Sequence, residues 1–432
     1  MTFGSWARRT GFWSLDTLSG RPIRHHYDDV AARMMSGQPD SDVLEQLLHH
    51  ATRTTPAYAP FADHPLDAFP VLDKATLKRD HDSYRSSVYL DARLHMRKTS
   101  GSTGMPLTVG QDVDKRRRSI ADVIYVNEMA GQRVGDRLMW LFAARFRPMP
   151  RSAQLLQNII PIDHVGLDDR RMKAIVQTLR RDHVNGVLSI PSTLGTLSRY
   201  LERMGHAPGA FRLRVVISTG ETLDRGAKQR IETLFGCPVV NRYANEENGV
   251  LACTRPGGDV LFLNRASYHF EFLKLESDEP ASAGALARVV ITDLYNRATP
   301  MIRYDTGDLA VVADSGGAAP TALLSVEGRR ADVIHTTSGG QLSAPSVSAF
   351  MVGHFPDITQ YQLVQIDATS YRLTVARGDA SYQEGDFTSA LTALLGPDAR
   401  LTVSMVERIP SPASGKHRAV ISEWEPGASR DT

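Results

Sequence analysis

Short apolar runs alternate with segments of helical periodicity through the middle of the chain. The helical segments, 170–182 and 225–235, place apolar residues three and four positions apart, so each has one apolar face. The runs around them are short and apolar, most with β-branched residues, and are typical of buried strands: 136–144, 185–190, 213–219 and 237–243. Strands that alternate with helices predict a largely parallel sheet covered by helices.

The pattern differs toward both ends of the chain. Before about residue 96, prolines are mixed with two capped helical patterns, at 41–53 and 72–84. From residue 259, strand patterns follow one another without long helices, which predicts a mixed or antiparallel sheet and leaves a small barrel open. Strand patterns then recur around a helical pattern at 385–396. We therefore predict an α/β protein with a large N-terminal domain, 1–327, and a small α+β C-terminal domain, 328–432.

Composition narrows the class of protein. A chain of 432 residues is too long for one compact core, so more than one domain is expected. Its 42% hydrophobic and 23% charged residues are ordinary values for a globular protein. A net charge of +2 argues against a nucleic-acid partner, and the densest basic run, DKRRRS at 114–119, is expected to be a solvated helix face. Two cysteines cannot build a disulfide framework. With no signal-peptide pattern and no long apolar stretch, we expect a cytoplasmic protein without a membrane span.

A hydroxyl-rich segment, TSGSTG at 99–104, has the chemistry of an anion-binding loop. Its glycines permit positive φ, so successive backbone N–H groups can converge on one oxyanion, and its hydroxyls add donors. The six residues are Thr99, Ser100, Gly101, Ser102, Thr103 and Gly104. Alone, such a run is equally typical of a flexible linker. The dinucleotide fingerprint GxGxxG, the phosphate loop GxxxxGK[ST] and the metal motif HExxH are absent.

Four downstream motifs change that reading: NRYANEENG (241–249), RYDTGD (303–308), GRRAD (328–332) and SGKHR (414–418). With TSGSTGMPL, they resemble, in order and approximate spacing, the core motifs of the acyl-adenylate-forming ligase superfamily. FPVLDKATLKRD, LSIPSTLGTLSRYLE, YHFEFL and MIRYDTGDL resemble the branch of phenylacetate–coenzyme A ligases and their capsule-biosynthesis relatives. The resemblance covers roughly residues 65–425 and implies the adenylate-forming fold, whose small C-terminal domain is mobile.

The resemblance implies a reaction in two halves. A carboxylate attacks the α-phosphorus of ATP, giving an acyl-AMP and pyrophosphate, and a second nucleophile then displaces AMP. ATP and Mg²⁺ are the implied cofactors, and the substrate is expected to be a small aryl or arylacetic acid. Coenzyme A is the expected acceptor, with an amine or a carrier-protein thiol as the alternative. No nucleic-acid or membrane partner is expected, and a homodimer stays open.

Roles in nucleotide binding come from the same resemblance. Residues 99–104 would hold the β- and γ-phosphates, and Asp308 would accept both ribose hydroxyls, which match the two oxygens of a carboxylate. Tyr243 would stack on adenine. The remaining nucleotide contacts are assigned to Thr219, Gly220, Glu221, Asn241 and Arg329.

Three further residues carry the implied chemistry. Lys416 would bring an ammonium to the α-phosphate and the substrate carboxylate, where negative charge develops. Glu247 would coordinate Mg²⁺, although Glu246 is the alternative ligand on register. Asp332 lies where the family has its hinge. The sequence departs from the family at Leu107, Ala244 and Glu246, which replace a lysine, a glycine and a threonine.

The acid pocket is assigned by position. Phe142 would form an aromatic wall, together with Phe146, and Arg145 a polar contact, while Pro191 and Ser192 would also line the pocket. Core packing or a surface position explains these residues equally well.

Two other classes of function are compatible with the sequence. A nucleotide hydrolase or kinase that uses residues 99–104 as its phosphate loop would produce ADP rather than AMP. A non-catalytic homologue would bind the nucleotide without turnover, and the three departures from the family pattern are consistent with it.

Overall fold

The computed structural model describes most of the chain: residues 3–36, 41–98, 107–142, 149–164, 167–314, 316, 320–329, 333–342, 344–355, 357–358, 360–376, 382–407, 409 and 418–424. By contacts, the chain divides into two compact units. The first is Met1–Thr306 with Ala310–Val326, and the second is Gly307–Leu309 with Glu327–Thr432.

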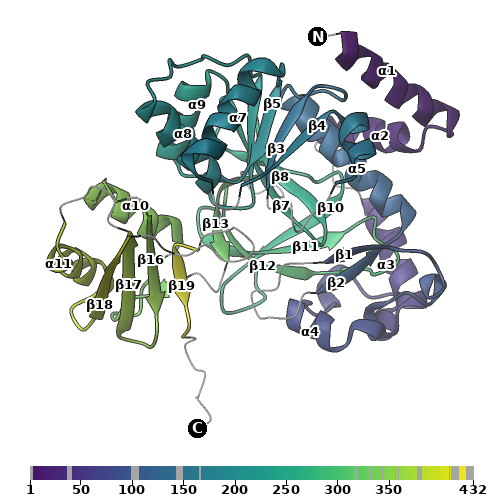
Figure 1. Ribbon diagram of the computed structural model, residues 1–432. Helices are drawn as coiled ribbons and strands as arrows, with labels where there is room; N and C mark the ends of the chain where they lie inside the picture. The colour runs from purple at the N-terminus through teal and green to yellow at the C-terminus, as the bar shows by residue number, and fades with distance from the viewer. Residues whose placement is uncertain are drawn as a thin grey trace. The chain divides into compact units, whose positions relative to one another are not determined.

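In the described part of the first unit, eleven strands form one mixed sheet (Figure 1). Their order across the sheet is β10-β11-β12-β13-β9-β8-β7-β6-β5-β3-β4. The strands from β4 to β7 run parallel, whereas β7, β8, β9 and β13 pair antiparallel. The bounds are β3 Leu138–Phe142, β4 Ile159–Asp163, β5 Gly186–Ser189, β6 Val215–Thr219, β7 Val239–Asn245, β8 Gly249–Thr254, β9 Leu261–Leu263, β10 Tyr268–Leu273, β11 Leu286–Asp293, β12 Tyr304–Val312 and β13 Ala322–Arg329.

Helices cover both faces of the parallel half. The helices α7 (Asp169–Arg181), α8 (Pro191–Arg203) and α9 (Arg225–Phe235) bury apolar residues against one face, and α5 (Val113–Met129) packs on the other. Figure 1 shows α7, α8 and α9 grouped together beside β5. An aspartate caps α5, α7 and α9: each carboxylate accepts a hydrogen bond from a free backbone N–H of the first turn.

The segment before the sheet is helical. It comprises α1 (Phe3–Leu18), α2 (Pro22–Ser36), α3 (Ser41–Thr54) and α4 (Lys74–Arg79), with 3₁₀ turns at Pro56–Phe61, Leu66–Ala68, His81–Tyr84 and Ser87–Tyr89. A two-stranded hairpin follows, β1 (His95–Lys98) and β2 (Thr108–Gln111), and α6 (Arg151–Gln157) lies between β3 and β4 in the chain. The helix α2 packs against α5, where Tyr27 donates a hydrogen bond to Glu128 (2.8 Å).

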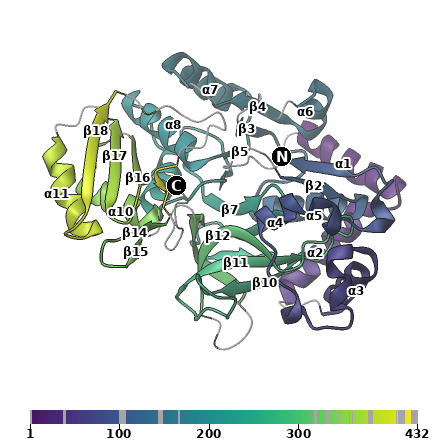
Figure 2. The ribbon, with the colours of Figure 1, turned by 90° about the horizontal axis from the view of Figure 1, so that it is seen from below.

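The second unit is a small α+β domain. Its four-stranded sheet has the order β18-β17-β16-β19, and α10 and α11 pack on it around Leu363, Leu373 and Phe387 (Figure 2). The bounds are β14 Ile334–His335, β15 Gln341–Leu342, α10 Ala344–His354, β16 Gln360–Gln365, β17 Ser370–Ala376, α11 Glu384–Leu395, β18 Arg400–Val406 and β19 Val420–Ser422.

The predicted fold class is confirmed, as is the mixed or antiparallel pairing expected after residue 259, while two details differ. The strands after residue 259 do not form a barrel of their own in the described residues, because they extend the same large sheet. The basic run at 114–119 is a solvated face only in part: Arg116 and Arg117 are exposed, whereas Lys115 and Arg118 are fully buried (0% exposed) and bond to acidic and hydroxyl partners. The mobility implied for the second unit stays a prediction.

Candidate active site at the carboxyl ends of the parallel strands

The carboxyl ends of β3, β5, β6 and β7 meet at one edge of the sheet, because these strands are parallel neighbours. In open α/β sheets, this edge is where ligands bind. Most of the described residues assigned to the nucleotide and the acid fall here: Phe142 ends β3, Pro191 and Ser192 follow β5, Thr219, Gly220 and Glu221 end or follow β6, and Asn241 and Tyr243 lie on β7.

The turn after β6 contacts the start of α8. Gly220 has φ +83°, a left-handed conformation that glycine adopts without strain and that turns the chain sharply after the strand. Glu221 then accepts two hydrogen bonds from Ser192, from its backbone N–H (2.9 Å) and from its hydroxyl (3.1 Å). The structure therefore brings the predicted adenine-side turn and the predicted acid-pocket segment together through one carboxylate at a helix N-terminus.

Tyr243 connects this edge to the RYDTGD strand. Its hydroxyl donates to Thr306 Oγ1 on β12 (3.4 Å), and Asp308 follows two residues later on that strand. Asn241 is held in register on β7, because its backbone N–H donates to Thr254 Oγ1 (2.9 Å). Thr219 uses its hydroxyl to bond the carbonyl of Arg242 (2.8 Å), so its side chain holds β6 to β7.

Glu247 lies in the turn between β7 and β8 and is only 6% exposed. Its Oε1 is 3.2 Å from Lys74 Nζ and accepts a hydrogen bond from the Tyr304 hydroxyl at the same distance. Lys74 begins α4, and a bridge between Leu72 and Tyr304 fixes that segment beside β12. Three segments far apart in the sequence therefore meet at one carboxylate.

The predicted phosphate loop is the connection of the β1–β2 hairpin. Its residues 99–104 lie outside the described part, but Lys98 and Thr108 on either side are paired. Gln111, at the end of β2, donates a hydrogen bond to the backbone carbonyl of Glu247 (2.9 Å). The base of the hairpin is therefore attached to the turn that carries the candidate metal ligand.

Leu107 shows why the family lysine is missing after the loop. Its side chain is 1% exposed and packs in the core with Leu72, Leu77 and Val109. A lysine there would be buried among apolar residues. Lys74 places an ammonium 3.2 Å from Glu247 Oε1.

The described acid-pocket residues include aromatic rings. Phe142 lies with its centroid 5.2 Å from Trp140, and the ring of His164 lies 6.5 Å from Phe142. His164 Nδ1 and Thr193 Oγ1 are 2.8 Å apart, which fixes the imidazole. Burial lowers the pKa of His164 from its ordinary value, so the ring is neutral near pH 7.

Several predicted residues cannot be placed at this edge. Arg145, Phe146, Asp332 and Lys416 lie outside the described residues, and Arg329, the last residue of β13, is exposed. In the part of the chain that the structure describes, no group of three or more His, Cys, Asp or Glu side chains could hold a metal ion. Mg²⁺ is commonly held by one or two carboxylates together with substrate phosphates. The carboxylates of Glu247 and its chain neighbour Glu246 fit that arrangement.

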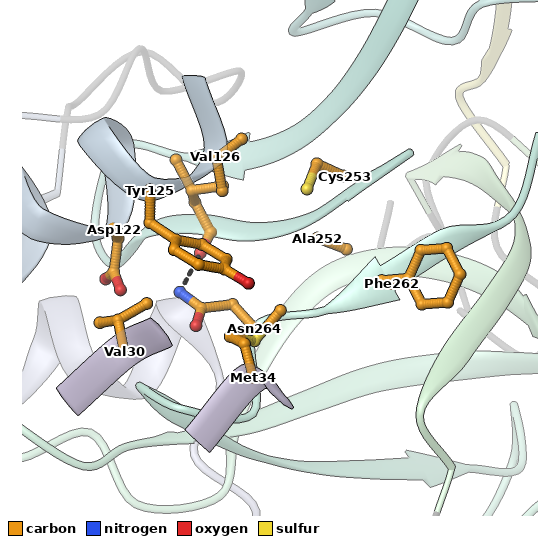
Figure 3. Close-up of a pocket in the computed structure, with 10 residues that line it drawn as sticks. Val30, Met34, Asp122, Tyr125, Val126, Ala252, Cys253, Phe262 and Asn264 are labelled. Atoms are coloured by element: carbon orange, nitrogen blue, oxygen red, sulfur yellow. Dashed lines mark hydrogen bonds between the residues drawn. The ribbon is translucent and has the colours of Figure 1, made fainter. Parts of the chain in front are cut away.

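A hollow on the other side of β8 is not a ligand site. Figure 3 shows its walls, which include Val30, Tyr125 and Cys253, with the Asn264 side chain bonded to the carbonyl of Val250 (3.0 Å). The space does not admit a water molecule. Burial raises the pKa of Asp122, which borders it, so this region is a packed part of the core.

Comparison with known proteins agrees with this geometry. No protein-family model matches the sequence. The chain is 21% identical over 337 residues to protein CapK of Staphylococcus aureus, covering 75% of this chain and 73% of CapK. It is 25% identical over 316 residues to phenylacetate–coenzyme A ligase of Aromatoleum evansii, covering 67% of this chain and 70% of the relative.

A solved 2-hydroxyisobutyryl-coenzyme A ligase has the same fold. Its postadenylation state, in complex with an acyl-AMP, superposes with a TM-score of 0.68 at 17% identity over 88% of both chains. Its thioesterification state, with 2-HIB-AMP and coenzyme A, gives a TM-score of 0.58 at 17% identity over 89% of this chain and 90% of that one. In its sequence relatives and in its fold, the chain is similar to the acyl-adenylate-forming ligase superfamily. Its sequence relatives include phenylacetate–coenzyme A ligases, and its enzyme class is AMP-forming acid–thiol ligase.

Sequence reasoning missed two residues of this ligase. Lys74 lies in the helical pattern at 72–84, and its link to Glu247 spans 173 positions, which no local pattern reveals. His164 follows a strand whose pattern is interrupted by proline, and nothing in the sequence pairs it with Thr193. None of the described helices of the ligase is long and apolar enough to cross a membrane.

Arg303, the first residue of the RYDTGD segment, holds together parts of the fold that lie far apart in the sequence. We therefore predict that its loss lowers stability. Its guanidinium bonds Glu271 and the carbonyls of Asp67 and Phe69, and the arginine and glutamate side chains are 8% and 18% exposed. We expect Arg303→Met to lower the free energy of unfolding by about 3 kcal/mol, because Glu271 loses its buried partner. Urea unfolding followed by circular dichroism measures this.

The matched control is a surface pair. Arg203 and Asp169 also form an ion pair, but their side chains are 57% and 71% exposed. Arg203→Met should change the free energy of unfolding by less than about 1 kcal/mol. An equal loss in both variants would contradict the structural role assigned to Arg303.

Proposed function

We propose that this ligase activates a small carboxylic acid, of aryl or arylacetic type, as an acyl-AMP with release of pyrophosphate, and then transfers the acyl group to the thiol of coenzyme A. The observation that carries the proposal is the meeting of Glu221 with Ser192, and of Glu247 with Lys74, along one edge of the sheet. We place the reaction in the cytoplasm, where ATP and coenzyme A are available.

The nucleotide would lie along the ends of β6 and β7. Gly220 lets the backbone approach the adenine plane closely, and Tyr243 offers a ring for stacking. Asp308 would accept the two ribose hydroxyls. The loop at 99–104, at the end of the hairpin that Gln111 attaches to Glu247, would supply N–H donors to the outer phosphates.

Glu247, with Glu246 as the alternative, would hold Mg²⁺ against the phosphates. The ion, when bound, neutralises the charge that develops during attack on phosphorus. Lys74 now pairs with Glu247, and the same ammonium can turn to a phosphate oxygen once the carboxylate binds the cation. Lys416 would contact the α-phosphate and the substrate carboxylate, and Asp332 would be the hinge between the two half-reactions.

The acid would lie between the aromatic end of β3 and the start of α8. Phe142 and Trp140 supply ring surface there, and Ser192 lies in the first turn of α8, where Glu221 accepts hydrogen bonds from its backbone N–H and its hydroxyl. Arg145 and Pro191 are assigned to the same pocket. An aromatic ring of modest size suits such a wall.

Product analysis tests the proposal. Incubation with ATP, Mg²⁺, coenzyme A and a panel of carboxylic acids should give AMP, pyrophosphate and an acyl-coenzyme A, which chromatography with mass spectrometry resolves. An amide or a loaded carrier protein, found in place of the coenzyme A thioester, would show that the acceptor is an amine or a carrier-protein thiol. ADP as the nucleotide product, or binding without turnover, would overturn the proposal.

Replacing Asp308 tests the ribose contact. Asp308→Ala removes two hydrogen bonds to a charged acceptor, so we expect about thirtyfold weaker ATP binding, equivalent to about 2 kcal/mol. Isothermal titration with ATP measures it. Asp305→Ala is the control, because Asp305 bonds Arg288 (3.2 Å) and should affect stability rather than ATP affinity. Unchanged ATP affinity in Asp308→Ala would remove the assignment.

A further inference from the structure

A fully buried ion pair lies next to the turn that carries Glu246 and Glu247. Lys115 Nζ and Asp293 Oδ2 are 2.7 Å apart, and both side chains are 0% exposed. Removing two charges from water often costs more free energy than their attraction returns, and apolar residues of similar volume serve as well or better. Stability alone therefore does not explain why this core contains the pair.

The hydrogen bonds of the pair end on the turn. Lys115 Nζ donates to the Tyr268 hydroxyl (3.1 Å), and that hydroxyl donates to the backbone carbonyl of Asn248 (2.7 Å). The Asn248 side-chain amide donates to Asp293 Oδ2 (3.3 Å). Both members of the ion pair thus reach Asn248, which follows Glu247 in the chain.

The backbone of the turn is constrained from the other directions as well. Asn245 Oδ1 accepts the backbone N–H of Asn248 (2.9 Å), and Gln111 bonds the carbonyl of Glu247 (2.9 Å). Gly249 has φ +120°, and a Cβ there would lie 3.2 Å from the Tyr268 hydroxyl. The turn therefore packs so closely on Tyr268 that its conformation depends on where that hydroxyl is held.

We propose that Lys115 and Asp293 are positioning residues, which hold the turn at 245–249, through Tyr268 and Asn248, in the conformation that presents Glu247 to magnesium-bound ATP. The inference rests on the proposed function. Neither residue touches the substrate, and their effect passes through the backbone of the turn. Partners that orient a metal-binding side chain are typically worth about 10- to 100-fold in metal affinity or activity.

Tyr268→Phe is the most selective test, because it removes only the hydroxyl that joins the pair to the turn. We expect a folded protein in which the Mg²⁺ concentration for half-maximal pyrophosphate exchange rises about tenfold, while the KM for the acid stays unchanged. Hydrogen–deuterium exchange of the ligand-free protein should show faster exchange of the amides in 245–249. A second variant, Lys115→Met with Asp293→Asn, removes both charges together and should give the same two changes.

Arg118→Met is the matched control. Arg118 is equally buried on α5, but its guanidinium bonds Ser267 and Asp29, not the turn. It should lower the midpoint of urea unfolding while leaving the Mg²⁺ dependence and the protection of 245–249 as in the wild type.

The proposal is overturned if Tyr268→Phe and the double variant both keep wild-type protection of 245–249 and a wild-type Mg²⁺ dependence. Absence of pyrophosphate exchange in the wild type would instead count against the proposed function. The exchange protection of 245–249 would then still decide whether the pair holds the turn.

Discussion

Lys416→Ala should lower the rate of acyl-AMP formation roughly a thousandfold while leaving ATP affinity within a few-fold of the wild type. The ammonium is expected to act where negative charge develops, on the α-phosphorus and the attacking carboxylate, so its loss raises the barrier more than it weakens ground-state binding. Single-turnover measurement of acyl-AMP with a responsive acid checks this.

Lys416→Arg separates charge from geometry. An arginine keeps the positive charge but has a planar, branched head group that cannot reproduce a single ammonium contact. We expect it to recover only a small part of the lost rate. An alanine variant with near-normal acyl-AMP formation would rule out the role assigned to Lys416.

Glu247→Gln should lower kcat about a hundredfold at saturating ATP and raise the Mg²⁺ requirement, because a neutral amide is a much weaker ligand for a hard cation. The variant also leaves Lys74 without its carboxylate partner, which lies 3.2 Å away. Initial rates measured across a Mg²⁺ titration, with ATP held in excess, separate the two effects.

Glu246→Gln is the neighbouring control. It changes the same charge one position earlier in the same turn, and it tests the alternative metal ligand. If Glu247 is the ligand, Glu246→Gln should keep the wild-type Mg²⁺ dependence. If only Glu246→Gln raised the Mg²⁺ requirement, the two assignments would have to be exchanged.

Local patterns predicted β3, β5, β6 and β7 of the parallel half of the sheet, but not its edge strand β4. Buried parallel strands are short apolar runs, and the helices between them have one apolar face, so both signals are contained within a dozen residues. The residues at the strand ends, such as Gly220 and Tyr243, could be located for the same reason: the motif follows the strand directly. The roles assigned to Tyr243, Asn241 and Glu247 came instead from the resemblance of this segment to the family motif, and they stay predictions.

Long-range pairing limited the rest. The strands after residue 259 have ordinary alternation, and nothing local shows that they join the edge of an existing sheet rather than close on themselves. Lys115 and Arg118 look like surface residues in sequence, because the groups that pair with them in the core, Asp293 and Ser267, lie far along the chain. Lys74 was missed for the same reason.

Acid-dependent exchange of labelled pyrophosphate into ATP tests the central claim most directly, since it requires reversible formation of an acyl-AMP and no second nucleophile. We predict exchange that depends on Mg²⁺, is stimulated by one group of small aryl or arylacetic acids, and disappears in Lys416→Ala. Exchange that does not depend on any acid, or no exchange across a broad panel of carboxylic acids, would contradict the account.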